Sequence, residues 1–138
     1  KIRPYAAADR VAVIALWQAC GLVVAHNNPG RDIDRKLKVD PQLFLVGCEG
    51  PDVVASVMGG YEGHRGWINY LAVSPDCQRQ GYGLRLMAAV EALLLERGCP
   101  KINLQIRSTN SNIIGFYQSL GYKVDDVLSL GKRLEHDA

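Results

Sequence analysis

The residues with the clearest chemical potential form the short run Gln78-Arg79-Gln80-Gly81-Tyr82-Gly83, between a strand-like and a helix-like stretch. Because Gly81 and Gly83 carry no Cβ, a ligand can lie directly against the backbone there. The first N–H groups of a helix lack intrahelical acceptors, and the helix dipole adds partial positive charge at that end. The run therefore predicts an anion-binding turn, with a pyrophosphate as its natural occupant.

Two familiar nucleotide-binding motifs do not fit this run. A dinucleotide-binding Rossmann turn needs a third glycine where Leu86 stands, and an acidic residue about 20 positions on, near Lys101. A P-loop needs a Gly-Lys-Ser/Thr triplet, which the chain lacks. Two glycines alone could equally relieve crowding where a strand meets a helix. The surrounding elements must therefore decide between these interpretations.

Hydrophobic periodicity predicts an α/β domain around the glycine run. Helices are expected at 9–20 with Asp9 as the N-cap, at 32–38, at 83–97, and from Asn110 or Asn112 to Leu120. Strands are expected at 43–48, 53–61, 67–73, 102–106, 122–124 and 127–134. The helix between strands 67–73 and 102–106 makes these two a parallel pair within a mostly antiparallel sheet.

The length, charge and cysteine content of the chain limit the classes of function that it can have. The 138 residues suit one domain covering 1–138, and a net charge of +2 without a basic stripe argues against a nucleic-acid partner. No stretch reaches the roughly 20 apolar residues that cross a membrane. The four cysteines are scattered without metal-ligand or redox spacing, so no metal is expected. Without a signal-peptide-like start or a disulfide pattern, the expected location is cytoplasmic.

A second segment gives the glycine run its context. In 110–122, Asn110 precedes Tyr117 by seven residues, and Tyr122 directly follows Gly121. Together with Gln78, Gly81 and Gly83, this segment resembles the two signatures of the GNAT superfamily of N-acetyltransferases. The resemblance covers essentially the whole chain. Segments 58–61 and 127–134 look like small YpeA-type bacterial members, and 104–117 is similar to the ribosomal-protein alanine N-acetyltransferases.

This resemblance implies the GNAT fold, with a central parallel strand pair that splays apart, and acetyl-CoA as the donor co-substrate. The exposed strand backbone would pair with the pantetheine, the glycine turn would hold the phosphates, and Asn110 would bond near the pantetheine. The implied cofactor-binding residues are Leu71, Ala72, Val73, Gln78, Arg79, Gln80, Gly81, Tyr82, Gly83, Leu84, Asn110 and Tyr117.

The resemblance also implies direct attack of an amine on the thioester, with Tyr117 near the sulfur as hydrogen-bond donor or acid. The related alanine N-acetyltransferases carry a Glu as base where this chain has Gln105. An amide cannot accept the proton, so Glu62 or His64, or an amine of lower pKa, must compensate. Glu62 is the residue we name as the catalytic base.

The acceptor is expected to be a primary amine of a small molecule, protein or peptide, and Asp32, Asp34 and Glu62 could attract a cationic amine. An alternative, raised by Gln105, is an acyl-CoA-binding or sensing domain with little catalysis. The long apolar segment 127–134 could also pair across a homodimer.

Overall fold

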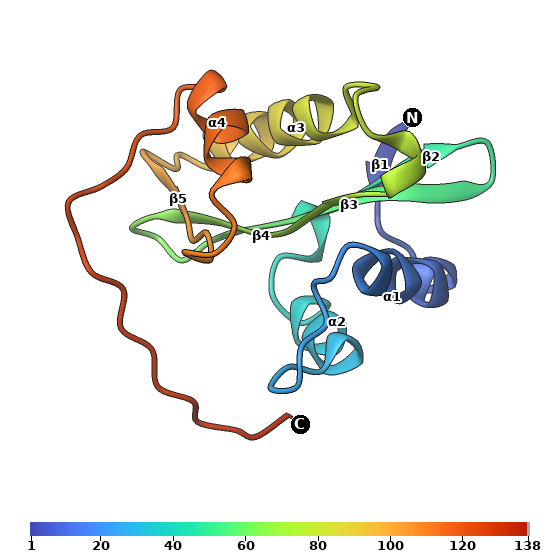
Figure 1. Cartoon of the computed structure of the whole chain (residues 1–138), viewed down its shortest axis with the longest axis horizontal. Helices are drawn as coiled ribbons and strands as arrows, with labels where there is room; N and C mark the ends of the chain where they lie inside the picture. Colours follow the sequence, from blue (N-terminus) through green and yellow to red (C-terminus); the bar gives the residue numbers. More distant parts are fainter. Residues whose placement is uncertain (138) are drawn as a thin grey trace.

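A five-stranded mixed sheet runs through the protein in the computed structural model, which describes residues 1–137 (Figure 1). The strands lie side by side in chain order, and only the last pair, β4 and β5, is parallel. This confirms the predicted mixed sheet with one parallel pair. The strands are β1 (Ile2–Pro4), β2 (Phe44–Glu49), β3 (Asp52–Tyr61), β4 (Gly66–Val73) and β5 (Ile102–Leu104).

Within residues 1–137, four helices cover the two faces of the sheet. Helices α3 and α4 lie on one face and α1 and α2 on the other (Figure 1). They are α1 (Arg10–Ala19), α2 (Pro29–Lys36), α3 (Tyr82–Glu96) and α4 (Asn112–Ser119), joined by 3₁₀ turns at Ala7–Asp9, Pro41–Leu43 and Pro75–Cys77. All four helices were predicted. Helix α2 begins earlier than expected because Asn28 caps it, accepting a hydrogen bond from the Arg31 N–H at 3.1 Å.

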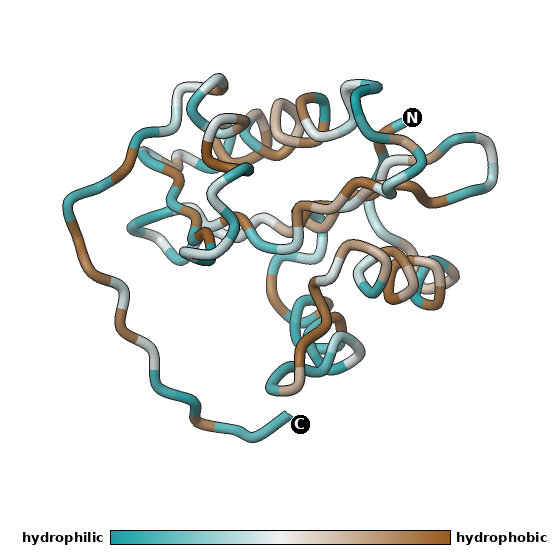
Figure 2. The backbone as a smooth tube through the Cα atoms, in the orientation of Figure 1, coloured by the Kyte–Doolittle hydropathy of each residue, from teal (hydrophilic) through white to brown (hydrophobic). Residues whose placement is uncertain are grey.

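Each face of the sheet has its own core. Leu86, Val90 and Leu94 recur along one side of α3 and are buried on the sheet. On the opposite face, Val13 and Trp17 of α1 are fully buried. Apolar segments therefore follow the strands and the inner sides of the helices (Figure 2). Burying each such side chain stabilises the fold by about 1.5–3 kcal/mol, so the sheet is a firm support for both faces.

The parallel pair is short and then opens. Three residue pairs join β4 to β5, and the last is Ile68 with Leu104. Beyond it, residues 69–73 of β4 have no strand partner on this side within the described chain. On the other side, the pairing of β4 with β3 shifts between Ser56 and Met58, so β4 bulges there. The predicted splay of the parallel pair is confirmed, but the pair lies at the edge of the described sheet and not at its centre, because residues 122–134 add no strand beyond β5.

The two predicted closing strands are wrong. Residues 122–124 and 127–134 form no strand, and Leu128 and Leu130 are 92% and 95% exposed. Figure 2 shows these apolar residues along the extended C-terminal tail. Strand β5 offers only three residues for pairing, and polar tail residues bond to side chains instead, such as Asp125 to Lys101 at 2.9 Å. A homodimer through this segment stays a prediction.

Within residues 1–137, no helix is both long enough and apolar enough to cross a membrane. The same residues hold no group of three His, Cys, Asp or Glu side chains that could bind a metal ion. The four cysteines are free thiols.

Candidate active site

The glycine run forms a tight turn at the start of α3. Gly81, which caps the helix, has a left-handed backbone with φ +82°, and Arg79 is left-handed too, with φ +66°. A non-glycine residue in this region costs of order 1–3 kcal/mol and marks a constrained site. The N–H groups of Tyr82 and Gly83 lack intrahelical acceptors because they lie in the first turn, and no side chain caps the helix in their place. This geometry makes a concave, anion-binding backbone.

The turn contacts both the end of β4 and helix α4. The Gln78 amide nitrogen lies 3.4 Å from the Val73 carbonyl oxygen. A Cβ on Gly83 would stand 3.2 Å from Cζ of Phe116, the neighbour of Tyr117 in α4. Only a glycine allows α3 and α4 to approach this closely without a shift. The two sequence signatures are therefore adjacent in space.

The side chains of the turn play different parts. Tyr82 is buried, and a Cβ on Gly47 of β2 would lie 3.1 Å from its ring, so only the backbone of Tyr82 faces a ligand. The Arg85 guanidinium lies 4.6 Å from the centre of the Tyr82 ring. Gln80 and Leu84 are exposed. Sequence reasoning missed Arg85, a cation one turn into the helix that faces the anion-binding end.

The open edge of β4 supplies the second part of the site. Ala72 is buried toward α1, whereas the side chains of Leu71 and Val73 pack toward α3. The side chains of residues 71–73 thus pack in the two cores. The backbone edge of β4 that faces β5 can therefore bind a ligand. An extended chain with amide groups, such as pantetheine, fits this edge, and the turn fits a pyrophosphate.

Tyr117 lies in the core on the α3 side and is 8% exposed. Its ring meets Phe116 and Tyr122 edge-on, with centroids 5.2 and 5.8 Å away. Burial raises the pKa of its phenol to about 12. The hydroxyl makes no hydrogen bond to another residue of the described chain, so it can donate to a ligand. Asn110 is exposed two residues before α4, where its carbonyl accepts from the Ile113 N–H at 3.4 Å.

Glu62 and Gln105 contact neither the glycine turn nor Tyr117. Glu62 is exposed in the β3–β4 turn, at the start of β4, roughly 20 Å along the strand from the glycine turn. Its carboxylate accepts from the backbone N–H groups of Arg65 and His64, and these bonds lower its pKa. Gln105 is exposed just after β5 and donates to the Ser129 hydroxyl.

A cluster around Tyr70 on the other face was not predicted. Tyr70 has a left-handed backbone with φ +52° in the middle of β4, and its ring stacks on Trp17 at 3.7 Å. Its hydroxyl donates to Asp32 at 2.6 Å and accepts from the Asn27 amide at 2.8 Å. No local pattern marks this cluster, because its residues come from three distant segments.

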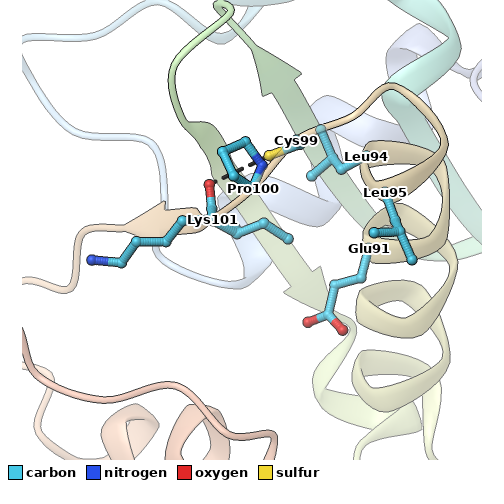
Figure 3. Close-up of a pocket in the computed structure, with 7 residues that line it drawn as sticks. Glu91, Leu94, Leu95, Cys99, Pro100 and Lys101 are labelled. Atoms are coloured by element: carbon cyan, nitrogen blue, oxygen red, sulfur yellow. Dashed lines mark hydrogen bonds between the residues drawn. The ribbon is translucent and has the colours of Figure 1, made fainter.

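One surface hollow lies away from these groups (Figure 3). It sits between the C-terminal half of α3 and the start of β5, at the opposite end of α3 from the glycine turn. The residues that line it are Glu91, Leu94, Leu95, Cys99, Pro100, Lys101 and Ile102.

Comparison with known proteins agrees with this geometry. An acetyltransferase of Pectobacterium atrosepticum is 47% identical over 137 residues, which cover 99% of this chain and 97% of the relative. Ard1 from Thermoplasma volcanium has the same fold, with a TM-score of 0.77 at 21% identity over 91% of this chain and 83% of that chain. The ribosomal-protein alanine N-acetyltransferase from Escherichia coli gives 0.72 at 22% identity, over 88% and 76%.

The profile of the Acetyltransferase (GNAT) family matches residues 9–122, which include the glycine turn, the open edge of β4 and helix α4. The expected family and its fold are confirmed, and this chain belongs to the GNAT acetyltransferases.

Proposed function

We propose that this protein is an acetyl-CoA-dependent N-acetyltransferase that acts on a primary amine of a small molecule, protein or peptide. The observation that carries the proposal is the meeting of the Gly81–Gly83 turn with the open edge of β4 and with α4, which bears Tyr117. Bound acetyl-CoA supplies an activated thioester.

The backbone holds the donor in this proposal. The N–H groups around Gly81 and Gly83 bind the pyrophosphate, and the edge of β4 from Leu71 to Val73, which lacks a strand partner on the β5 side, binds the pantetheine amides. N–H groups of the same edge stabilise a carbonyl oxygen that gains negative charge, because donors fixed in a strand need no reorganisation.

Tyr117 acts as a neutral hydrogen-bond donor to the departing sulfur. Its pKa is raised to about 12 by burial, whereas a thiol titrates near 8.5, so complete proton transfer would be uphill by about 5 kcal/mol. A hydrogen bond to a developing thiolate needs no such transfer. The raised pKa therefore favours stabilisation by hydrogen bonding over acid catalysis.

Glu62 finds little support as the base. Its pKa is lowered by the backbone N–H groups of Arg65 and His64, which weakens it as a proton acceptor. An amine with a pKa near 10.4 is almost fully protonated at neutral pH. The chain is therefore better suited to amines of lower pKa, which lose their proton to water.

Calorimetry with acetyl-CoA tests donor binding, and the chain offers a matched pair of glycine variants. Gly81→Ala forces an alanine into a left-handed backbone at the turn, and we expect about tenfold weaker binding. Gly63→Ala imposes comparable strain at φ +102° in the β3–β4 turn, without neighbouring atoms, and should leave the affinity unchanged. Absence of acetyl-CoA binding by the parent protein would contradict the proposal.

The acyl-CoA-sensing alternative is favoured by Gln105, which stands where the related enzymes carry an acid. Turnover separates the two functions. We expect release of free CoA thiol when acetyl-CoA is mixed with a panel of amines and peptides. A protein that binds acetyl-CoA but releases no thiol with any acceptor would instead support the sensing function.

A further inference from the structure

Tyr70 is held in a costly conformation by contacts on every side. The Trp17 indole N–H donates to the Ser56 hydroxyl at 2.9 Å, and that hydroxyl donates to the Tyr70 carbonyl at 2.9 Å. The Tyr70 ring lies flat on Trp17. Strained residues of this kind persist where the surroundings over-determine them, often at functional sites. In this conformation the Tyr70 hydroxyl points at helix α2, where it meets Asp32.

The Tyr70 hydroxyl fixes one carboxylate, Asp32, in the first turn of α2. Its Oδ2 accepts from Tyr70 at 2.6 Å, and its side chain keeps 26% of its surface exposed. Its other oxygen lies 3.5 Å from Arg35, whose shorter contacts run to Glu135 and Asp137 in the tail. Asp32 is thus positioned and partly accessible, and its ion pair with Arg35 is longer than the contacts that Arg35 makes to Glu135 and Asp137.

The other two acids that the sequence offers for a cationic acceptor make contacts of their own away from β4. Asp34 forms an ion pair with Arg10 at 2.8 Å. Glu62 accepts two backbone hydrogen bonds within its own turn. Of these three acids, only Asp32 is bonded to a residue of β4.

The position of Tyr70 links Asp32 to the reaction. Tyr70 lies two residues beyond Ile68, the last residue of β4 that pairs with β5, and so within the open stretch 69–73. Helix α2 covers the face of the sheet opposite α3 (Figure 1). An acceptor that meets a donor held on the open edge therefore passes Asp32 if it enters from this face.

We propose that Asp32 selects the acceptor by binding a positively charged group other than the amine that is acetylated. A carboxylate bound to the reacting ammonium itself would stabilise its protonated form and slow attack. The carboxylate therefore suits a second cation. This inference rests on the proposed acetyl transfer and names its acceptor class: diamines, or peptide amines with a neighbouring lysine or arginine.

Matched acceptors test this assignment. The peptide amides Ala-Lys and Ala-norleucine share one reacting α-amine and differ in a side-chain charge. The parent should acetylate Ala-Lys with a kcat/KM about tenfold higher or more, the scale of one charge-assisted hydrogen bond. Asp32→Asn should remove that advantage by raising KM for Ala-Lys, with kcat unchanged and Ala-norleucine within twofold of the parent.

Two further variants control for structural effects. Asp34→Asn makes the same change of charge two residues away and should keep the preference for Ala-Lys. Tyr70→Phe keeps the ring on Trp17 and releases only the carboxylate, so KM for Ala-Lys should rise about threefold. If Asp32→Asn does not fold, the Tyr70→Phe result decides the proposal.

The outcomes separate this inference from the proposed function. Equal activity of the parent on both peptides, or equal losses on both in Asp32→Asn, would overturn the role of Asp32 and leave acetyl transfer standing. A parent protein that binds acetyl-CoA but acetylates no amine would overturn both.

Discussion

Tyr117 and Tyr70 belong to opposite faces of the sheet near the point where β4 and β5 separate, and burial raises the pKa of both phenols. The hydroxyl of Tyr117 has no partner among residues 1–137. The hydroxyl of Tyr70 is held between Asp32 and Asn27. Similar shifts in pKa thus accompany different roles: a free hydroxyl can serve a reacting group, and a bound one can position a neighbour.

The two faces also differ in what they are made of. The proposed donor side uses backbone, through the left-handed Gly81 and the open edge of β4. The proposed acceptor side uses side chains, in which Trp17, Ser56 and Tyr70 contact one another. A backbone site keeps its shape when surface side chains change, whereas a side-chain site can change its specificity by single substitutions.

The largest expected effect tests the free hydroxyl. Tyr117→Phe removes only the phenolic oxygen and should lower kcat by about 10²-fold or more, the scale for removing one positioned hydrogen-bond donor from a developing negative charge. The affinity for acetyl-CoA should stay within about twofold, because the ring and its packing are retained. Steady-state thiol release and calorimetry measure the two quantities.

Tyr122→Phe is the matched control for this variant. Its hydroxyl donates to Glu91 at 2.6 Å, and its ring lies 5.8 Å from that of Tyr117. Losing this bond should lower the free energy of unfolding by about 1 kcal/mol and leave kcat within twofold. Similar kcat losses in both variants would mean that Tyr117 acts only through packing.

The glycine turn and helix α4 could be predicted from the sequence because their geometry depends on local residues. Gly81 and Gly83 at the start of a helix indicate exposed backbone amides. Asn110 and Tyr117 follow with the spacing of the second GNAT signature. The left-handed Arg79 could not be predicted, because its conformation depends on the surrounding turn. Likewise, strands at 122–134 fit the local pattern but require partners that a three-residue β5 does not provide.

The cluster around Tyr70 could not be predicted for a related reason. Trp17, Ser56 and Tyr70 each fit an ordinary role in a helix or strand core, and only tertiary packing brings them together. Nothing in the sequence distinguishes Asp32 from Asp34 and Glu62 as a group that attracts a cation. Its distinction arises from the Tyr70 hydroxyl, which reaches it across 38 residues of chain.

A smaller effect tests the acceptor side by loosening Tyr70. Ser56→Ala leaves the buried Trp17 N–H and the Tyr70 carbonyl without their partner, so the free energy of unfolding should fall by about 2 kcal/mol. We expect KM for Ala-Lys to rise about threefold, with unchanged affinity for acetyl-CoA. Urea unfolding, kinetics and calorimetry provide these values.

Ser119→Ala is the control for this loss. Its exposed hydroxyl donates to the Phe116 carbonyl within α4, and its removal should change stability by less than about 0.5 kcal/mol. If Ser56→Ala weakened acetyl-CoA binding as much as it raised the acceptor KM, the two faces would be coupled and the contrast between them would fail.

The smallest effect concerns the pH dependence that burial gives to Tyr117. The raised pKa keeps the phenol protonated until the pH approaches about 12. A phenol with the ordinary pKa of about 10 would be half ionised at pH 10, and kcat would fall twofold there. We therefore expect kcat to stay flat between about pH 8 and 10, measured with a weakly basic amine so that the ionisation of the acceptor does not intervene.

Circular dichroism must show that the protein stays folded over this range. A buried phenol with a raised pKa stabilises the fold less as the pH rises above the pKa that the phenol has in the unfolded chain. A kcat of the parent that falls to half its plateau at about pH 10, with no such fall in Tyr117→Phe, would mean that Tyr117 titrates as an exposed phenol. The proposed donor side would then be more accessible to solvent than its packing indicates.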